Sequence, residues 1–100
     1  MHLTNDSFDE IIQNNSFCLV MFEGSWCPVC KQYEPFMKQL KKKNDGGLFL
    51  LNIDRNKQVA SRFHIMGTPT FILFHDGLET ERFVGAVTPD IIKGLVKQCR

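Results

Sequence analysis

A chain of 100 residues has room for one domain with one core, so residues 1–100 are predicted to form a single domain. Its 43% hydrophobic content, including nine Phe residues, can offset the entropy lost on folding, which excludes a disordered chain. The net charge is +1 with acidic and basic residues interspersed, so we expect no nucleic-acid partner and no attraction to an anionic membrane.

The first half of the chain predicts a helix, a strand and a second helix. Apolar residues at helical spacing behind Asn, Asp and Ser caps predict a helix over residues 7–13. The continuous apolar run over residues 17–22 is typical of a central strand buried on both faces. After Cys27 a helical pattern runs to three consecutive Lys residues and stops at residues 44–47, and Pro35 should kink this helix.

The second half predicts three further strands and two helices. Residues 48–53 read as a buried strand and residues 57–64 as a short helix. Residues 70–74 form a strong strand pattern, and a His-Asp-Gly turn predicts an antiparallel neighbour over residues 79–84.

The last helix predicted begins after Thr88, with Thr88 as N-cap and Pro89 at the first helical position. Its inward side chains are predicted to be Ile91, Ile92, Leu95 and Val96. The order of all these elements indicates the α/β class: a mixed sheet with parallel βαβ crossovers, a closing hairpin and helices on both faces.

Cys27 and Cys30 have a C-x-x-C spacing at the point where a buried strand gives way to a helix. Backbone N–H groups and the helix dipole favour an anion there, so a thiolate is stabilised, and the thiolate is the reactive form in disulfide exchange. Cys27, nearer the helix end, should attack a substrate first. Cys30 lies on the same side of the first turn and should resolve the mixed disulfide.

These cysteines lie within a longer resemblance to the thioredoxin family. Trp26 to Lys31 resembles the W-C-x-x-C-K site of that family, and Pro35 stands where its active-site helix carries a proline. Further similar segments are Leu51-Asn52-Ile53-Asp54, Gly67-Thr68-Pro69-Thr70-Phe71, His75-Asp76-Gly77 and Val84-Gly85-Ala86. The resemblance implies a thioredoxin fold, built from a βαβ and a ββα unit, with Cys27 and Cys30 as the redox-active disulfide.

Pro69 illustrates what the resemblance adds to the residues. From the sequence alone an X-Pro bond is expected to be trans, but the G-x-P-T segment of the family carries a cis proline that faces the disulfide. Thr68 would then present its backbone to an extended client peptide, as in strand addition. The substrate groove implied is shallow and largely apolar, and its residues are Trp26, Pro28, Val29, Ile53, Thr68, Pro69 and Gly85.

The chain departs from the family at the proton-handling position. Thioredoxins usually carry a buried Asp six residues before the first Cys and a Lys on the neighbouring strand, where this chain has Met21 and Leu50. Glu23 lies two residues further along, on the same strand face and nearer the cysteines. Glu23 is therefore a candidate catalytic acid–base residue for Cys30, with an ordinary solvated Glu at a strand end as the alternative.

The Pro28-Val29 pair between the cysteines differs from the Gly-Pro of ordinary thioredoxins and is closest in form to the Pro-Tyr of glutaredoxins. The Gly-Gly and Asp contacts with which glutaredoxins hold glutathione have no match after Pro69, so protein disulfides are favoured as substrates. Cys18 lies in an apolar strand and is expected to pack in the core, whereas Cys99 is expected to be an exposed spare thiol.

The leading functional prediction is a monomeric protein-disulfide reductase without cofactor, which reduces client proteins and is recycled by thioredoxin reductase or a small thiol. No signal peptide or membrane span is visible, so a cytoplasmic location is expected. One alternative is a thiol oxidase or disulfide isomerase of an oxidising compartment. Another is a metal-binding or redox-inert module, although no second cysteine pair completes a zinc site and the three His residues lack ligand spacing, so no metal is predicted.

Overall fold

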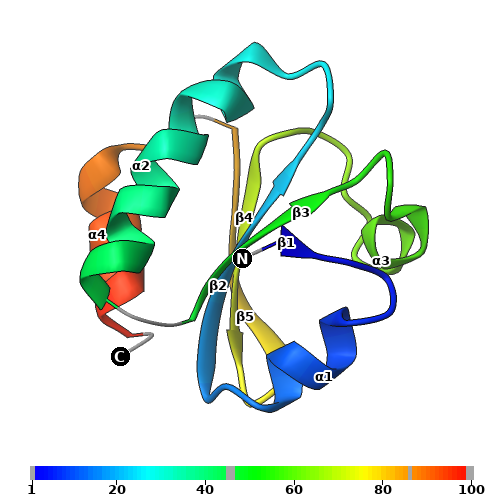
Figure 1. The fold of residues 1–100 in the computed structure, drawn as a ribbon, viewed down its shortest axis with the longest axis horizontal. Helices are drawn as coiled ribbons and strands as arrows, with labels where there is room; N and C mark the ends of the chain where they lie inside the picture. The colour runs from blue at the N-terminus through cyan, green and yellow to red at the C-terminus, as the bar shows by residue number, and fades with distance from the viewer. Residues whose placement is uncertain (1, 45–46, 86, 99–100) are drawn as a thin grey trace.

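The computed structural model describes residues 2–44, 47–85 and 87–98. Strands and helices alternate along the chain and then close with a hairpin and a helix (Figure 1). Their bounds are β1 (His2–Leu3), α1 (Phe8–Gln13), β2 (Phe17–Glu23), α2 (Pro28–Asn44), β3 (Leu48–Asn52), α3 (Lys57–Arg62), β4 (Thr70–His75), β5 (Leu78–Val84) and α4 (Pro89–Lys97).

The strands form one mixed sheet in the order β1-β3-β2-β4-β5. β3 pairs in parallel with β1 and β2, while β4 runs antiparallel to β2 and to β5. The unit β2-α2-β3 is a parallel crossover, and β4-β5-α4 is a hairpin followed by a helix. The predicted α/β class, built from a βαβ and a ββα unit, is confirmed. β1 was not predicted, because a strand of two residues is too short to show a period.

Successive side chains of β2 enter two different cores, as expected for a central strand. Cys18, Val20 and Phe22 pack on the side covered by α1 and α3. Leu19 and Met21 pack on the side covered by α2 and α4. Residues two apart on β2 therefore face the same helix layer. Glu23, two residues after Met21, lies on the α2 side with it.

Local signals account for how several elements begin and end. The Asp76-Gly77 turn has positive φ at both residues, 51° and 85°, which fits the predicted tight hairpin. The Thr88 hydroxyl accepts a hydrogen bond from the Ile91 N–H at 3.3 Å, and Pro89 occupies the first helical position, so the predicted N-cap is confirmed. Pro35 lies inside α2, which continues through it, and the kink stays a prediction.

Two predicted details of the helices are wrong. The helix expected over residues 57–64 ends at Arg62, because His64 adopts a left-handed conformation with φ 52° that a helix cannot include. Ile91 was expected to point inward but is 41% exposed. It lies about 100° around α4 from Ile92, whose neighbours Leu95 and Val96 complete the buried face.

Candidate functional site

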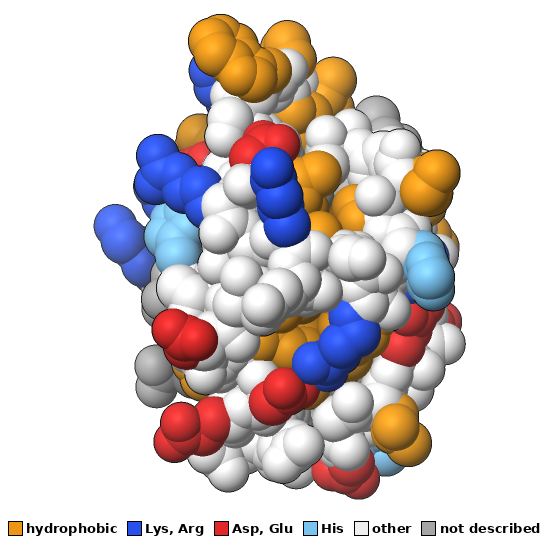
Figure 2. Space-filling model, turned by 90° about the vertical axis from the view of Figure 1, so that its right-hand side faces the viewer, with side chains coloured by type: hydrophobic (Ala, Val, Ile, Leu, Met, Phe, Trp, Pro, Cys, Tyr) orange, Lys and Arg blue, Asp and Glu red, His pale blue; other side chains and the backbone are white. Residues whose placement is uncertain are grey.

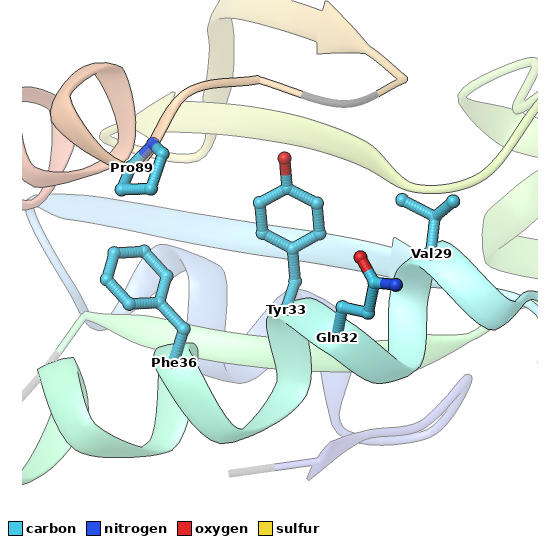
Figure 3. Close-up of a pocket in the computed structure, with 5 residues that line it drawn as sticks. All are labelled: Val29, Gln32, Tyr33, Phe36 and Pro89. Carbon is cyan, nitrogen blue, oxygen red and sulfur yellow. The ribbon is translucent and has the colours of Figure 1, made fainter.

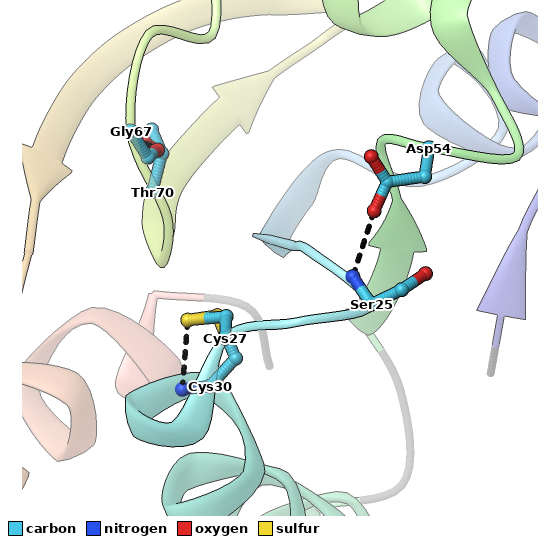
Figure 4. The surroundings of a disulfide bond; sticks show 6 residues. All are labelled: Ser25, Cys27, Cys30, Asp54, Gly67 and Thr70. Carbon is cyan, nitrogen blue, oxygen red and sulfur yellow. Dashed lines mark hydrogen bonds between the residues drawn. A yellow bond between two sulfur atoms is a disulfide. The ribbon is translucent and has the colours of Figure 1, made fainter.

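Cys27 and Cys30 form a disulfide at the N-terminus of α2, with Cα atoms 5.2 Å apart (Figure 4). The Cys30 N–H donates a hydrogen bond of 3.1 Å to Cys27 Sγ, so a free helix-end amide points at this sulfur as the sequence predicted. Cys27 is 9% exposed and Cys30 is fully buried. A substrate sulfur can therefore approach Cys27, and Cys30 can be reached only from within the protein.

The loop that presents Cys27 is held by the end of β3 and by the connection between β3 and α3. The Ser25 N–H donates a hydrogen bond of 2.7 Å to Asp54 Oδ2 (Figure 4). Asn52 Nδ2 donates to Ser25 Oγ at 3.2 Å, while Asn52 Oδ1 accepts from the N–H of Asp54 at 2.9 Å. The hydrogen bond from the Ser25 backbone holds the pKa of Asp54 below its usual value. Asp54 thus stays ionised and fixes the loop.

A cis peptide bond joins Thr68 to Pro69 opposite the cysteines, as the resemblance implied. The Pro69 carbonyl accepts a hydrogen bond of 2.8 Å from the Gly85 N–H, and Gly85 has φ 88°. The Thr70 hydroxyl donates to the Gly67 carbonyl at 2.6 Å. These bonds tie the Thr68-Pro69 turn to the ends of β4 and β5.

An open groove of about 460 Å³ lies beside Cys27, between the β2–α2 loop and the turn at Thr68. Five of the seven predicted groove residues line it, whereas Pro69 and Gly85 lie beside it, joined to each other by their backbone hydrogen bond. Trp26 is 93% exposed at its rim. The lining residues are Gly24, Trp26, Cys27, Pro28, Val29, Ile53, Asp54 and Thr68.

Sequence reasoning missed Gly24 and Asp54 as groove residues. A Cβ at Gly24 would lie 3.4 Å from Thr68 Oγ1 and 3.8 Å from Cys27 Cβ, so the groove floor is packed closely at this point. The Asp54 carboxylate is the charged group of the lining. Asp54 belongs to the segment Leu51-Asn52-Ile53-Asp54, which was noted for its resemblance to the thioredoxin family. Its place beside the groove was missed because it depends on a contact with Ser25, 29 residues away in the sequence.

The apolar surface continues from the groove along α2 toward α4. A second hollow of about 420 Å³ is lined by Val29, Gln32, Tyr33, Phe36 and Pro89 (Figure 3), and Val29 lines both hollows. The Tyr33 hydroxyl donates to the Val87 carbonyl, which holds the aromatic wall of this hollow in place. Figure 2 shows the face around α3, where both signs of charge lie among uncharged groups and hydrophobic side chains gather at the end that carries the β2–α2 loop.

Glu23 is 7% exposed, which overturns the alternative of an ordinary solvated carboxylate. Burial raises its pKa to about 7, helped by the negative charge and hydrogen bond of Glu34 and opposed by Lys38. Burial alone would raise the pKa of Glu34, but its hydrogen bonds with Lys38 and Glu23 lower it instead. Met21 and Leu50, which pair across the sheet where the family usually carries its ion pair, are fully buried and apolar.

Of the remaining cysteines, Cys18 is fully buried in the core as predicted. Burial raises the pKa of its thiol to about 11, so it is a poor nucleophile at neutral pH. Cys99 lies outside the described residues. Within the described part of the chain, no three His, Cys, Asp or Glu residues are grouped to hold a metal ion. No helix among the described residues has the length and apolar character needed to cross a membrane.

Comparisons with known proteins match nearly the whole chain. A sequence model of the family described as Thioredoxin matches residues 1–98. Thioredoxin H2 of Arabidopsis thaliana is 35% identical over 91 residues, 90% of this chain and 68% of that protein. A thioredoxin of Staphylococcus haemolyticus is 36% identical over 85 residues, 83% of this chain and 81% of that protein. Among solved structures, a mutant thioredoxin from Halobacterium salinarum superposes with a TM-score of 0.89 at 28% identity, covering 99% of this chain and 88% of that one.

Proposed function

The chain belongs to the thioredoxin family and is a thiol–disulfide oxidoreductase, and we propose that within this class it reduces the disulfides of client proteins. The observation that supports a nucleophile at Cys27 is the hydrogen bond from the Cys30 N–H to Cys27 Sγ at the start of α2. An amide aimed at that sulfur stabilises a thiolate over a thiol, and it acts beside an open groove.

In the proposed first step, the Cys27 thiolate attacks one sulfur of a client disulfide. A bond forms between Cys27 Sγ and that sulfur, the client disulfide breaks, and its other sulfur leaves with the electron pair. The groove offers the client a largely apolar surface, lined by Trp26, Pro28, Val29, Ile53 and Thr68. The Thr68-Pro69 turn, with Gly85 bonded to it, offers backbone groups for strand addition. This surface suits extended segments of many sequences.

In the second step, Cys30 resolves the mixed disulfide. Glu23 is the proposed base that removes the Cys30 proton, since it is buried on the α2 side of β2 and titrates near neutral pH. The Cys30 thiolate then bonds to Cys27 Sγ, and the second client sulfur leaves with its electron pair. The client disulfide gains two electrons and two protons, and the Cys27–Cys30 dithiol becomes the disulfide.

We propose thioredoxin reductase or a small thiol as the source of the electrons that restore the dithiol. The protein would act as a monomer in the reducing cytoplasm, where thiols are kept reduced. A thiol oxidase or disulfide isomerase of an oxidising compartment is the second candidate, because Pro28-Val29 and the apolar Met21–Leu50 pair depart from the reductase pattern.

Thiol-driven reduction of insulin tests the proposed activity. The native protein should accelerate insulin precipitation, Cys27→Ser should abolish the acceleration, and Cys30→Ser should accumulate a mixed disulfide. Cys18→Ala is the matched control and should retain the activity, because Cys18 lies in the core away from the groove. Activity that survives in Cys27→Ser would refute the assignment of the nucleophile.

Equilibration against glutathione buffers tests the direction. A reductase should have a potential at or below the cytosolic poise, about −220 to −260 mV by extraction methods. A value near −180 mV or above would assign the protein to the oxidase or isomerase alternative.

A further inference from the structure

Three side chains of α2 follow one line along the helix that starts at the resolving cysteine. Cys30, Glu34 and Lys38 are spaced by four residues, and residues at this spacing lie one turn apart on the same helix face. Lys38 Nζ lies 3.1 Å from Glu34 Oε1. The line therefore leads from a fully buried sulfur to an ion pair at the protein surface.

Glu23 faces this line from the end of β2. Its carboxyl group is hydrogen-bonded to that of Glu34, and such a bond requires a proton between the two carboxyl groups. Glu23 is 7% exposed, whereas the side chains of Glu34 and Lys38 are 30% and 52% exposed. Solvent access thus increases from Glu23 to Glu34 to Lys38.

A hollow of about 290 Å³ lies on the outer side of the same helix turn. It is lined by Lys31, Glu34, Pro35 and Lys38. The volume is large enough for several water molecules, and Glu34 and Lys38 supply polar atoms that bind water. Glu34 therefore contacts both the buried carboxyl of Glu23 and a site that bulk water reaches.

We propose that Glu34 and Lys38 are positioning residues for the resolving step, in which Glu34 passes to water the proton that Glu23 takes from Cys30. This inference rests on the proposed role of Glu23 as the base. The S–H bond of Cys30 breaks, and Glu23 accepts this proton on one oxygen while the proton that it shares with Glu34 moves to Glu34. The sulfur electron pair of Cys30 forms the bond to Cys27 Sγ, and the mixed disulfide breaks as the client sulfur leaves with its electron pair. Lys38 holds Glu34 in its anionic form, ready to accept the proton from Glu23 and release it into the hollow.

The charges around Glu23 predict opposite effects for two substitutions. Glu34 and Lys38 face Glu23 from α2, His2 of β1 acts on Glu34, and β3 places the neutral Asn52 beside Glu23. Removing Glu34 takes away the anion that keeps a proton on Glu23, so Glu23 should titrate at lower pH. Removing Lys38 takes away a stabilising cation, so Glu23 should titrate at higher pH.

Two measurements on the full chain test the proposal. Carbon NMR of glutamate-labelled oxidised protein follows the titration of Glu23, and quenched-flow mass spectrometry follows the formation and decay of the mixed disulfide with a disulfide-containing protein. The variants are Glu34→Gln, Lys38→Met and Lys38→Arg. Lys42→Met is the matched control, because Lys42 is exposed on the same helix.

We expect the Glu23 midpoint to fall by about half a pH unit or more in Glu34→Gln, and to rise by a similar amount in Lys38→Met. Decay of the mixed disulfide at neutral pH should slow about threefold or more in Glu34→Gln, while its formation is unchanged. Lys38→Arg should restore the native titration midpoint, and Lys42→Met should behave as the native protein.

The proposal would be overturned if the titration midpoint of Glu23 moved in neither Glu34→Gln nor Lys38→Met, or moved in the same direction in both. Unchanged decay of the mixed disulfide in Glu34→Gln would also overturn it. Failure of the proposed function gives a different result, because native protein would then form no mixed disulfide at all. The NMR titration would still report the coupling between Glu23 and Glu34 in that case.

Discussion

Glu23→Gln is predicted to stabilise the protein at pH 8 and to leave its stability nearly unchanged at pH 4.5. Glu23 is buried and its pKa is raised from 4.5 to about 7. A buried acid with a raised pKa binds its proton more tightly in the folded state, so folding stability falls as the pH rises from about 4.5 to about 7. Gln has the shape of the protonated acid and can donate to Glu34, but it cannot ionise.

The size of the effect follows from the displacement of the pKa. The rise from 4.5 to about 7 corresponds to ~3 kcal/mol, at about 1.4 kcal/mol per pH unit. Because Glu34 and Lys38 share the titration with Glu23, part of this free energy remains in the variant. We therefore expect Glu23→Gln to gain ~1–3 kcal/mol of unfolding free energy at pH 8.

Guanidinium unfolding of the oxidised protein at pH 4.5 and pH 8 measures this difference. Far-UV circular dichroism is the appropriate probe, since it follows the loss of the helices and strands throughout the described chain. Glu10→Gln is the matched control, because Glu10 is exposed on α1. The reasoning is refuted if Glu23→Gln is no more stable than the native protein at pH 8, or if its gain is the same at both pH values.

Three further predictions test other parts of the structure. Thr88→Ala removes the cap that accepts the Ile91 N–H and should lower the unfolding free energy by ~1 kcal/mol in urea; an unchanged urea midpoint would contradict this role. Gly85→Ala forces a side chain into a φ of 88° and should destabilise by ~1 kcal/mol, whereas Gly94→Ala inside α4 has open space and should stabilise by a similar amount; shifts of equal sign would refute the conformational argument. Iodoacetamide at pH 7 should modify Cys27 of the reduced native protein and leave Cys18 untouched until the chain is denatured, as read by peptide mass spectrometry; rapid labelling of native Cys18 would show that it is not buried.

The sequence alone predicted those elements whose pattern of residue types lies within a short stretch of the chain. The apolar run of β2, the turn at Asp76-Gly77 and the Thr88 cap each lie within a few residues, and the structure confirms all three. The two residues of β1 form a strand only because His2 and Leu3 pair with Leu50 and Leu51 of β3. No pattern within the first residues could show that pairing.

In the candidate site, too, features set by neighbouring residues were predicted and contacts between distant residues were missed. The cysteine pair was found because its two residues are three apart and next to a helix start. The hydrogen bond between Ser25 and Asp54 was missed because it joins the loops after two neighbouring strands, at residues 29 apart in the sequence. Glu23 could be assigned to a strand face by counting, but its raised pKa depends in part on Glu34, eleven residues later on another element.

The position of the acid also decides which element supplies its counter-charge. An acid at position 21 would lie opposite residue 50 of β3, where the family's Lys could meet it, but here Met21 and Leu50 fill that place with apolar side chains. At the end of the strand, Glu23 lies opposite Asn52 and receives its cation from Lys38 of α2. The charges around the buried acid are therefore carried by the same helix as the resolving cysteine. A disturbance of the first turns of α2 should change the protonation of Glu23 and the position of Cys30 together, because Cys30, Glu34 and Lys38 are fixed to one helix face.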